Sequence, residues 1–141
     1  MFKIYSKGCE YLLRAIAKVS ADQQDCPFLA KDICKKAKVP EASTRKMLQQ
    51  LVAAGLLEAV SGPGGGYRFA RAPQNISLLS LLQAADGPEM FEQCIMGLPQ
   101  CSEHKPCPIH YSWKKMKHQI VDEMKKNTLK DLIMMDKERS K

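Results

Sequence analysis

The sequence predicts a mainly α-helical chain in which a winged helix-turn-helix domain, with a β-hairpin wing, precedes a long C-terminal helix. Three observations support this fold class: apolar residues at helical spacing over residues 9–54, a glycine-rich hairpin pattern over 56–70, and a further amphipathic stretch near the C-terminus. A length of 141 residues suits one domain with an extension. We therefore expect a winged domain over 1–87, a cysteine-bearing loop over 88–107, and a helix with its tail over 108–141.

Three helices are expected before the hairpin. The apolar face of the first is formed by Tyr11, Leu12, Ala15, Ile16 and Val19. The second helix covers residues 30–37, and the third begins at Pro40. Proline suits a helix start, because the backbone N–H that it lacks would have no partner within the helix at that position. Gly55 ends the third helix. Two helices joined by a short turn, the second starting with short polar side chains, are typical of a helix-turn-helix.

Two short strands follow these helices. Residues 56–60 are predicted as a strand, and residues 67–70, which alternate between apolar and polar side chains, as the returning strand. The turn between them reads Ser61-Gly62-Pro63-Gly64-Gly65-Gly66. Helices followed by such a hairpin are the element order of a winged helix-turn-helix. The glycines allow the backbone to approach phosphate or the minor groove closely. A nucleotide-binding phosphate loop is disfavoured, because the Gly-Lys-Ser/Thr ending is missing and a strand follows the run.

The C-terminal part holds a fourth helix over 76–85, the aperiodic loop over 88–107, and a long helix that starts at Pro108. The long helix carries an apolar seam of Ile109, Trp113, Met116, Ile120 and Met124. A lone helix cannot bury such a seam against itself, so it either folds back on the domain or pairs with its copy in a second chain. We favour a dimerisation helix, since two-fold DNA sites suit two-fold proteins. A short further turn is expected at residues 129–133.

The charge distribution points to a polyanionic partner. The net charge is +7, of which residues 1–75 carry +6 and residues 76–141 carry +1. The N-terminal residues show no signal-peptide pattern, and no apolar run reaches the ~18 residues of a membrane span, so we expect a cytoplasmic protein with no membrane partner. We do not expect an enzyme, because the sequence shows no Ser/His/Asp set, no paired carboxylates and no nucleotide-binding loop.

Three cysteines and a histidine cluster in and just after the loop. Cys94, Cys101, Cys107 and His110 follow one another with six, five and two residues between them. Thiolates bind soft metals and iron–sulfur clusters, and imidazole is a compatible fourth ligand. Three interpretations stay open from these residues: an iron–sulfur cluster, a structural zinc ion, or a metal-free switch in which Cys94 and Cys101 form a disulfide.

Together, the helix-turn-helix, the wing Gly62-Pro63-Gly64-Gly65-Gly66-Tyr67 and the three cysteines before a long helix resemble the IscR/NsrR-type bacterial regulators over roughly residues 5–135. The resemblance implies a homodimeric winged-helix transcription regulator, most often a repressor, that binds a pseudo-palindromic double-stranded operator. In cluster-binding members an iron–sulfur cluster tunes DNA affinity and senses redox conditions, nitric oxide or iron–sulfur status.

The resemblance also implies a ligand set. Cys94, Cys101 and Cys107 match the family's cluster cysteines. His110 lies where IscR-like members use a histidine, which points to a 2Fe–2S cluster, and Glu10 lies where NsrR-like members offer a carboxylate from the partner chain, which points to 4Fe–4S. Cys9 is a further candidate beside Glu10. The first gap holds six residues where the commoner pattern has five, so this chain departs from the family there.

The same resemblance places the DNA contacts on the third helix and on the wing. Short hydroxyls at a helix N-terminus suit phosphate, an arginine can reach a guanine edge, and wing arginines can lie in or beside the minor groove. The expected DNA-binding residues are Ser43, Thr44, Arg45, Lys46, Gly64, Gly65, Arg68 and Arg71.

Overall fold

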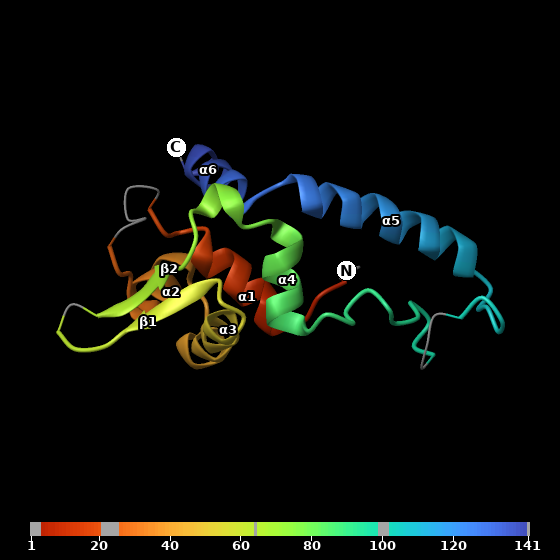
Figure 1. Cartoon of the computed structure of the whole chain (residues 1–141), viewed down its shortest axis with the longest axis horizontal. Coiled ribbons are helices and arrows are strands. Elements are labelled where there is room, and N and C mark those ends of the chain that lie inside the picture. The colour runs from red at the N-terminus through yellow and green to blue at the C-terminus, as the bar shows by residue number, and fades with distance from the viewer. Residues whose placement is uncertain (1–3, 21–25, 64, 99–101, 141) are drawn as a thin grey trace.

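The computed structural model describes residues 4–20, 26–63, 65–98 and 102–140 (Figure 1). Its elements are, in chain order, α1 (Lys7–Ile16), α2 (Ala30–Ala37), α3 (Glu41–Ala53), β1 (Leu57–Val60), β2 (Gly66–Phe69), the 3-10 segment η2 (Pro73–Asn75), α4 (Leu78–Asp86), α5 (His110–Lys126) and α6 (Leu129–Arg139). This order confirms the mainly α-helical winged helix-turn-helix fold.

The core of the winged domain forms where α1, α2 and α3 pack together. Ser6 caps α1, since its side chain accepts a hydrogen bond from the backbone N–H of Cys9. Leu12 and Ile16 of α1 and Leu48 of α3 are fully buried, as their spacing predicts. The helix-turn-helix turn needs a left-handed residue, and Lys38 supplies it with φ 57° and ψ 50°. α3 therefore starts at a fixed angle to α2.

The wing is attached to the rest of the domain through the segment before α2. β1 and β2 pair antiparallel, with Leu57 opposite Phe69. The backbone N–H of Phe28 donates to the Tyr67 carbonyl over 2.7 Å, and the N–H of Tyr67 donates to the Phe28 carbonyl over 2.8 Å. A side chain on Gly66, which has φ +147°, would overlap the Phe28 carbonyl oxygen, so glycine is required at this position.

α6 is longer than the sequence predicted. The expected short turn is an eleven-residue helix, which begins with a capping box between Thr128 and Asp131. Leu129 and Ile133 of α6 are buried in the same core as the winged domain. The chain after α5 therefore returns to that domain, while the boundaries at residues 87 and 107 stay predictions.

α5 and the loop before it form an extension that points away from the wing (Figure 1). Within the apolar seam, Trp113 is buried, whereas Ile109 is 44% exposed and Met116 is 45% exposed. Packing within one chain thus covers only part of the seam. None of the helices in the part of the chain that the structure describes is long and apolar enough to cross a membrane.

Candidate DNA interface and cysteine site

The exposed face of α3 carries three of the four residues of this helix that are expected to contact DNA. Ser43, Arg45 and Lys46 are exposed in the first turns of the helix. Thr44 corrects the expectation, because it is fully buried and its hydroxyl donates to the Pro40 carbonyl over 2.7 Å. Thr44 therefore stabilises the start of α3 from inside, and its buried hydroxyl is not exposed to a DNA phosphate.

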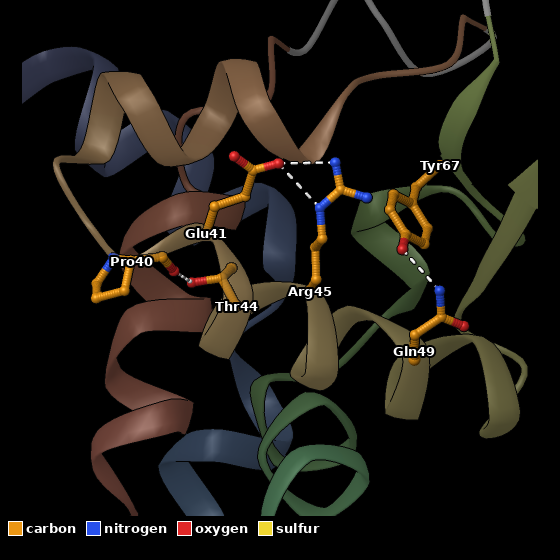
Figure 2. A network of polar contacts seen from close by, with 6 residues as sticks. All are labelled: Pro40, Glu41, Thr44, Arg45, Gln49 and Tyr67. Carbon is orange, nitrogen blue, oxygen red and sulfur yellow. Dashed lines mark hydrogen bonds and ion pairs between the residues drawn. The ribbon is translucent and has the colours of Figure 1, made fainter.

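Arg45 is held by an ion pair within the helix. Its Nε and Nη2 donate to Oε1 of Glu41, over 2.9 Å and 2.7 Å, one turn earlier on α3 (Figure 2). The hydrogen bond and the negative charge of Glu41 raise the pKa of Arg45 above its ordinary value. Both side chains are exposed, so the pair contributes little to stability, but it sets the direction of the guanidinium.

A second polar contact joins α3 to the wing, and the sequence did not predict it. Nε2 of Gln49 donates to the hydroxyl of Tyr67 over 2.8 Å (Figure 2). Gln49 lies on the turn of α3 that follows Arg45, and Tyr67 is 6% exposed in β2. The only signal in the sequence was the four-residue spacing between Arg45 and Gln49, which places both on one helix face.

The two arginines of the wing differ in their surroundings. Nε of Arg68 donates to Glu58 on the opposite strand over 2.7 Å, whereas Arg71 is exposed beyond the end of β2. A side chain on Gly65 would overlap the Val60 carbonyl oxygen, so this glycine keeps the hairpin turn tight. Gly64 lies outside the described residues.

In the loop, the structure brings two of the three cysteines together. Cys94 is 7% exposed and Cys107 is 9% exposed. The pKa of Cys94 is lowered, mainly by the backbone N–H of Met96, which lies 3.4 Å from its sulfur, and also by a hydrogen bond with the Cys107 side chain. Two converging sulfurs, one of them favoured as thiolate, fit the chemistry of a metal or iron–sulfur centre. Cys101 lies outside the described residues.

The candidate fourth ligands lie on two different helices. His110 is the first residue of α5, is 3% exposed, and donates its backbone N–H to the Cys107 carbonyl over 3.0 Å. Glu10 lies on α1, where its carboxylate is 3.2 Å from Nζ of Lys7. Across the described ranges, no three His, Cys, Asp or Glu side chains already form a group able to hold a metal ion.

Side chains of α5 hold the loop in place. Nε1 of Trp113 donates to the carbonyl of Gln93 over 3.3 Å, and Nζ of Lys117 donates to the carbonyl of Phe91 over 2.8 Å. Lys114 also forms an ion pair with Glu103. The segment that leads into Cys94 is therefore fastened to the helix that carries His110.

Two cysteines outside the loop have raised pKa values, in contrast to the lowered pKa of Cys94. Burial raises the pKa of Cys9 to about 12, with a smaller contribution from the charge of Asp86. Burial also raises the pKa of Cys34. Both side chains are buried in the hydrophobic core of the winged domain, where Cys9 and Cys34 pack as core residues. Cys26 is exposed.

Comparisons with known proteins agree with this fold. A sequence model of the Rrf2 family, described as "Iron-dependent Transcriptional regulator", matches residues 5–135. The chain is 30% identical over 135 residues to a protein of Aquifex aeolicus named "Putative HTH-type transcriptional regulator", covering 94% of this chain and 93% of that protein. It is also 30% identical over 131 residues to the HTH-type transcriptional regulator IscR of Vibrio vulnificus, covering 93% of this chain and 77% of the relative.

A solved structure has the same architecture. The structure of CymR, the global cysteine regulator of B. subtilis, superposes with a TM-score of 0.76 and 20% identity. The match covers 96% of this chain and 98% of that protein. At this identity the likeness concerns the fold alone.

Proposed function

The chain belongs to the Rrf2 family of transcriptional regulators, and from this premise we propose that it is a homodimeric repressor whose operator affinity depends on an iron–sulfur cluster. It is a DNA-binding protein and not an enzyme. The single observation that carries the cluster part of the proposal is the contact between the buried side chains of Cys94 and Cys107.

The proposed DNA-binding surface combines α3 with the wing. Ser43 and Lys46 would contact phosphate, Arg45 would reach a base edge in the major groove, and Arg68 and Arg71 would follow the minor groove. The excess positive charge of the first 75 residues supports this assignment.

The proposed ligands of the cluster are Cys94, Cys101 and Cys107, with His110 of the same chain or Glu10 of the second protomer as the fourth. When bound, the cluster would supply iron–thiolate bonds that hold the loop in one arrangement. His110 supports a single-chain site, because it is buried and its backbone is hydrogen-bonded to Cys107. A hollow of about 400 Å³ between Phe91 and α5 leaves room for a segment of the second protomer.

A second copy of the chain would cover the seam of α5. Ile109 and Met116 of this seam are exposed in the single chain, and Tyr111 beside them is 67% exposed. The loop that carries Cys94 is fastened to the same helix by Trp113 and Lys117. A change in the loop would therefore move the dimerisation helix and alter the spacing of the two recognition helices. This spacing must be fixed if the two helices are to bind half-sites ~34 Å apart.

The test is a spectroscopic and binding experiment on protein purified without air. We expect visible absorption and a Mössbauer signal of an iron–sulfur cluster, and loss of both in Cys101→Ala with the helical content unchanged. Cys26→Ala, which removes an exposed cysteine outside the loop, is the matched control and should keep the absorption. Operator affinity should differ ~5- to 150-fold between the reconstituted protein and the apo-protein. Equal affinities would contradict the sensor role.

The contact between Cys94 and Cys107 also favours a second candidate, a metal-free thiol switch. A two-electron oxidant such as hydrogen peroxide would take two electrons and two protons from these thiols and leave a disulfide. The sequence pointed to Cys94 and Cys101 for this pair, and Cys101 lies outside the described residues. The side-chain hydrogen bond between Cys94 and Cys107 supports Cys94 and Cys107 as an alternative pair. Iron and sulfide analysis separates this candidate from the cluster, and zinc analysis separates both from a structural zinc ion.

A further inference from the structure

Gln49 is an exposed recognition-helix residue to which the proposed function assigns no part. Its amide has a hydrogen-bond partner within the protein, because Nε2 donates to the hydroxyl of the buried Tyr67 over 2.8 Å (Figure 2). Among the residues that the structure describes, this is the one hydrogen bond of the Gln49 side chain. The wing therefore fixes the direction in which the recognition helix presents this amide.

The amide groups that remain match one base. A glutamine side chain has a carbonyl oxygen and two N–H donors, and the Tyr67 hydroxyl uses one of these donors. The carbonyl oxygen and the second N–H of the exposed Gln49 side chain remain available to bind a base. In the major groove adenine presents an N6 donor beside the N7 acceptor, and an amide binds this pair with two hydrogen bonds.

We propose that Gln49 reads an adenine in each operator half-site and that Tyr67 is the positioning residue that orients its amide before DNA arrives. The inference rests on the proposed DNA-binding function of α3. Arg45, which is hydrogen-bonded to Glu41, lies four residues before Gln49 on α3. Four helical residues rise ~6 Å and base pairs are ~3.4 Å apart, so the adenine lies within about two base pairs of the base that Arg45 contacts.

The contribution of Tyr67 is to preorganise Gln49. Ordering a flexible side chain at an interface weakens binding ~2- to 12-fold, and a side chain already held in its bound orientation avoids this loss. The contribution acts only through Gln49, so it has no value once the amide is gone.

The experiment selects preferred sites from a library of randomised DNA duplexes, using full-length protein prepared without air. Gln49→Ala should reduce the preference for A·T at one position of each half-site by ~5- to 150-fold and leave the preferences at other positions unchanged. Tyr67→Phe keeps the ring against Phe28 and removes only the hydroxyl. It should reduce the same preference ~2- to 12-fold, and the double variant should match Gln49→Ala.

Two further variants give matched comparisons. Gln74→Ala removes an exposed glutamine from η2, the segment that packs against α6, and should keep every base preference. Lys46→Ala removes a proposed phosphate contact, so it should weaken binding to all sequences alike and lower the salt dependence. Thermal unfolding of each variant shows that the fold is retained.

Three results would overturn the inference. Unchanged preferences in Gln49→Ala, or an equal loss on all sequences, would show that this residue does not read a base. An unchanged profile in Tyr67→Phe would remove the positioning role of the tyrosine. If the wild-type protein itself enriched no sequence, the proposed function would fail together with the inference, whereas enrichment by the wild type with unaltered variants would refute the inference alone.

Discussion

Replacing Gly66 with alanine would test how the wing is attached to the domain. Gly66 has φ +147°, where an L-residue is strained, and its new Cβ would overlap the carbonyl oxygen of Phe28. That carbonyl accepts the N–H of Tyr67, and the N–H of Phe28 donates back to the Tyr67 carbonyl. The substitution therefore adds backbone strain and breaks or stretches two hydrogen bonds between segments distant in the sequence.

The magnitude follows from these two contributions. Left-handed or otherwise strained backbone costs an L-residue about 1–2 kcal/mol. Each of the two backbone hydrogen bonds contributes about 0.5–1.5 kcal/mol, so Gly66→Ala should lower the free energy of unfolding by about 2–5 kcal/mol in total. Gly62→Ala is the matched control, because Gly62 has φ +86° but nothing lies within 4 Å of its new Cβ. It should lose only about 1–2 kcal/mol.

Urea unfolding followed by circular dichroism measures both variants under the same conditions. The difference between Gly66→Ala and Gly62→Ala, about 1–3 kcal/mol, isolates the attachment to Phe28 from the backbone strain. If the two variants lost the same stability, the hydrogen-bonded bridge between Phe28 and Tyr67 would not hold the wing, and the explanation for the glycine at position 66 would be wrong.

Three further predictions concern the core, its thiol and the contact between the end of α4 and the start of α1. Leu129→Ala should destabilise the protein by about 2–5 kcal/mol, and the half-buried Leu132→Ala by clearly less, in the same urea experiment, because Leu129 is fully buried in the winged-domain core. Burial raises the pKa of Cys9 to about 12 in the folded protein, against an ordinary value of 9.0. The stability that this shift contributes is therefore complete below pH 9 and is lost as the pH rises towards 12. In unfolding measured as a function of pH, Cys9→Ala should flatten this decline. Asp86→Ala should speed hydrogen exchange at the backbone N–H of Ser6, which donates to the Asp86 carboxylate over 2.7 Å, and unchanged exchange would contradict that contact.

The parts of the fold that depend on local pattern were predictable from the sequence. The predicted helix over residues 30–37 has those bounds in the structure. In the hairpin, β1 begins one residue later than predicted, and β2 begins and ends one residue earlier. α6 was underestimated because Asn127 and Thr128 interrupt the apolar pattern. The interruption is itself a helix start, since Thr128 and Asp131 three residues later form a capping box.

The expected DNA contacts were less predictable, because side-chain direction decides them. Thr44 was assigned to the surface by its residue type and its place near a helix start, yet it lies four residues before Leu48 and seven before Leu51, both fully buried. That spacing indicated the buried face of α3. The contact between Gln49 and Tyr67 was beyond sequence reasoning, because it depends on how the hairpin folds against the recognition helix.

The end of α4, directly before the cysteine loop, is also tied to the helix that carries Glu10. The hydroxyl of Ser6 donates to the Asp86 carboxylate over 2.5 Å, and the same oxygen accepts the N–H of Cys9 in the first turn of α1. Gly8 in that turn lies against Met47 of α3, where a larger residue would meet the Met47 side chain. The last residue of α4 is thus fixed to α1, and the first part of the loop that follows is fixed to α5 through Phe91 and Gln93. Under the proposed function, a rearrangement around Cys94 would act on α3 through α1, which packs against it, as well as on α5. Two separate contacts would then carry the state of the loop to the proposed DNA-binding surface.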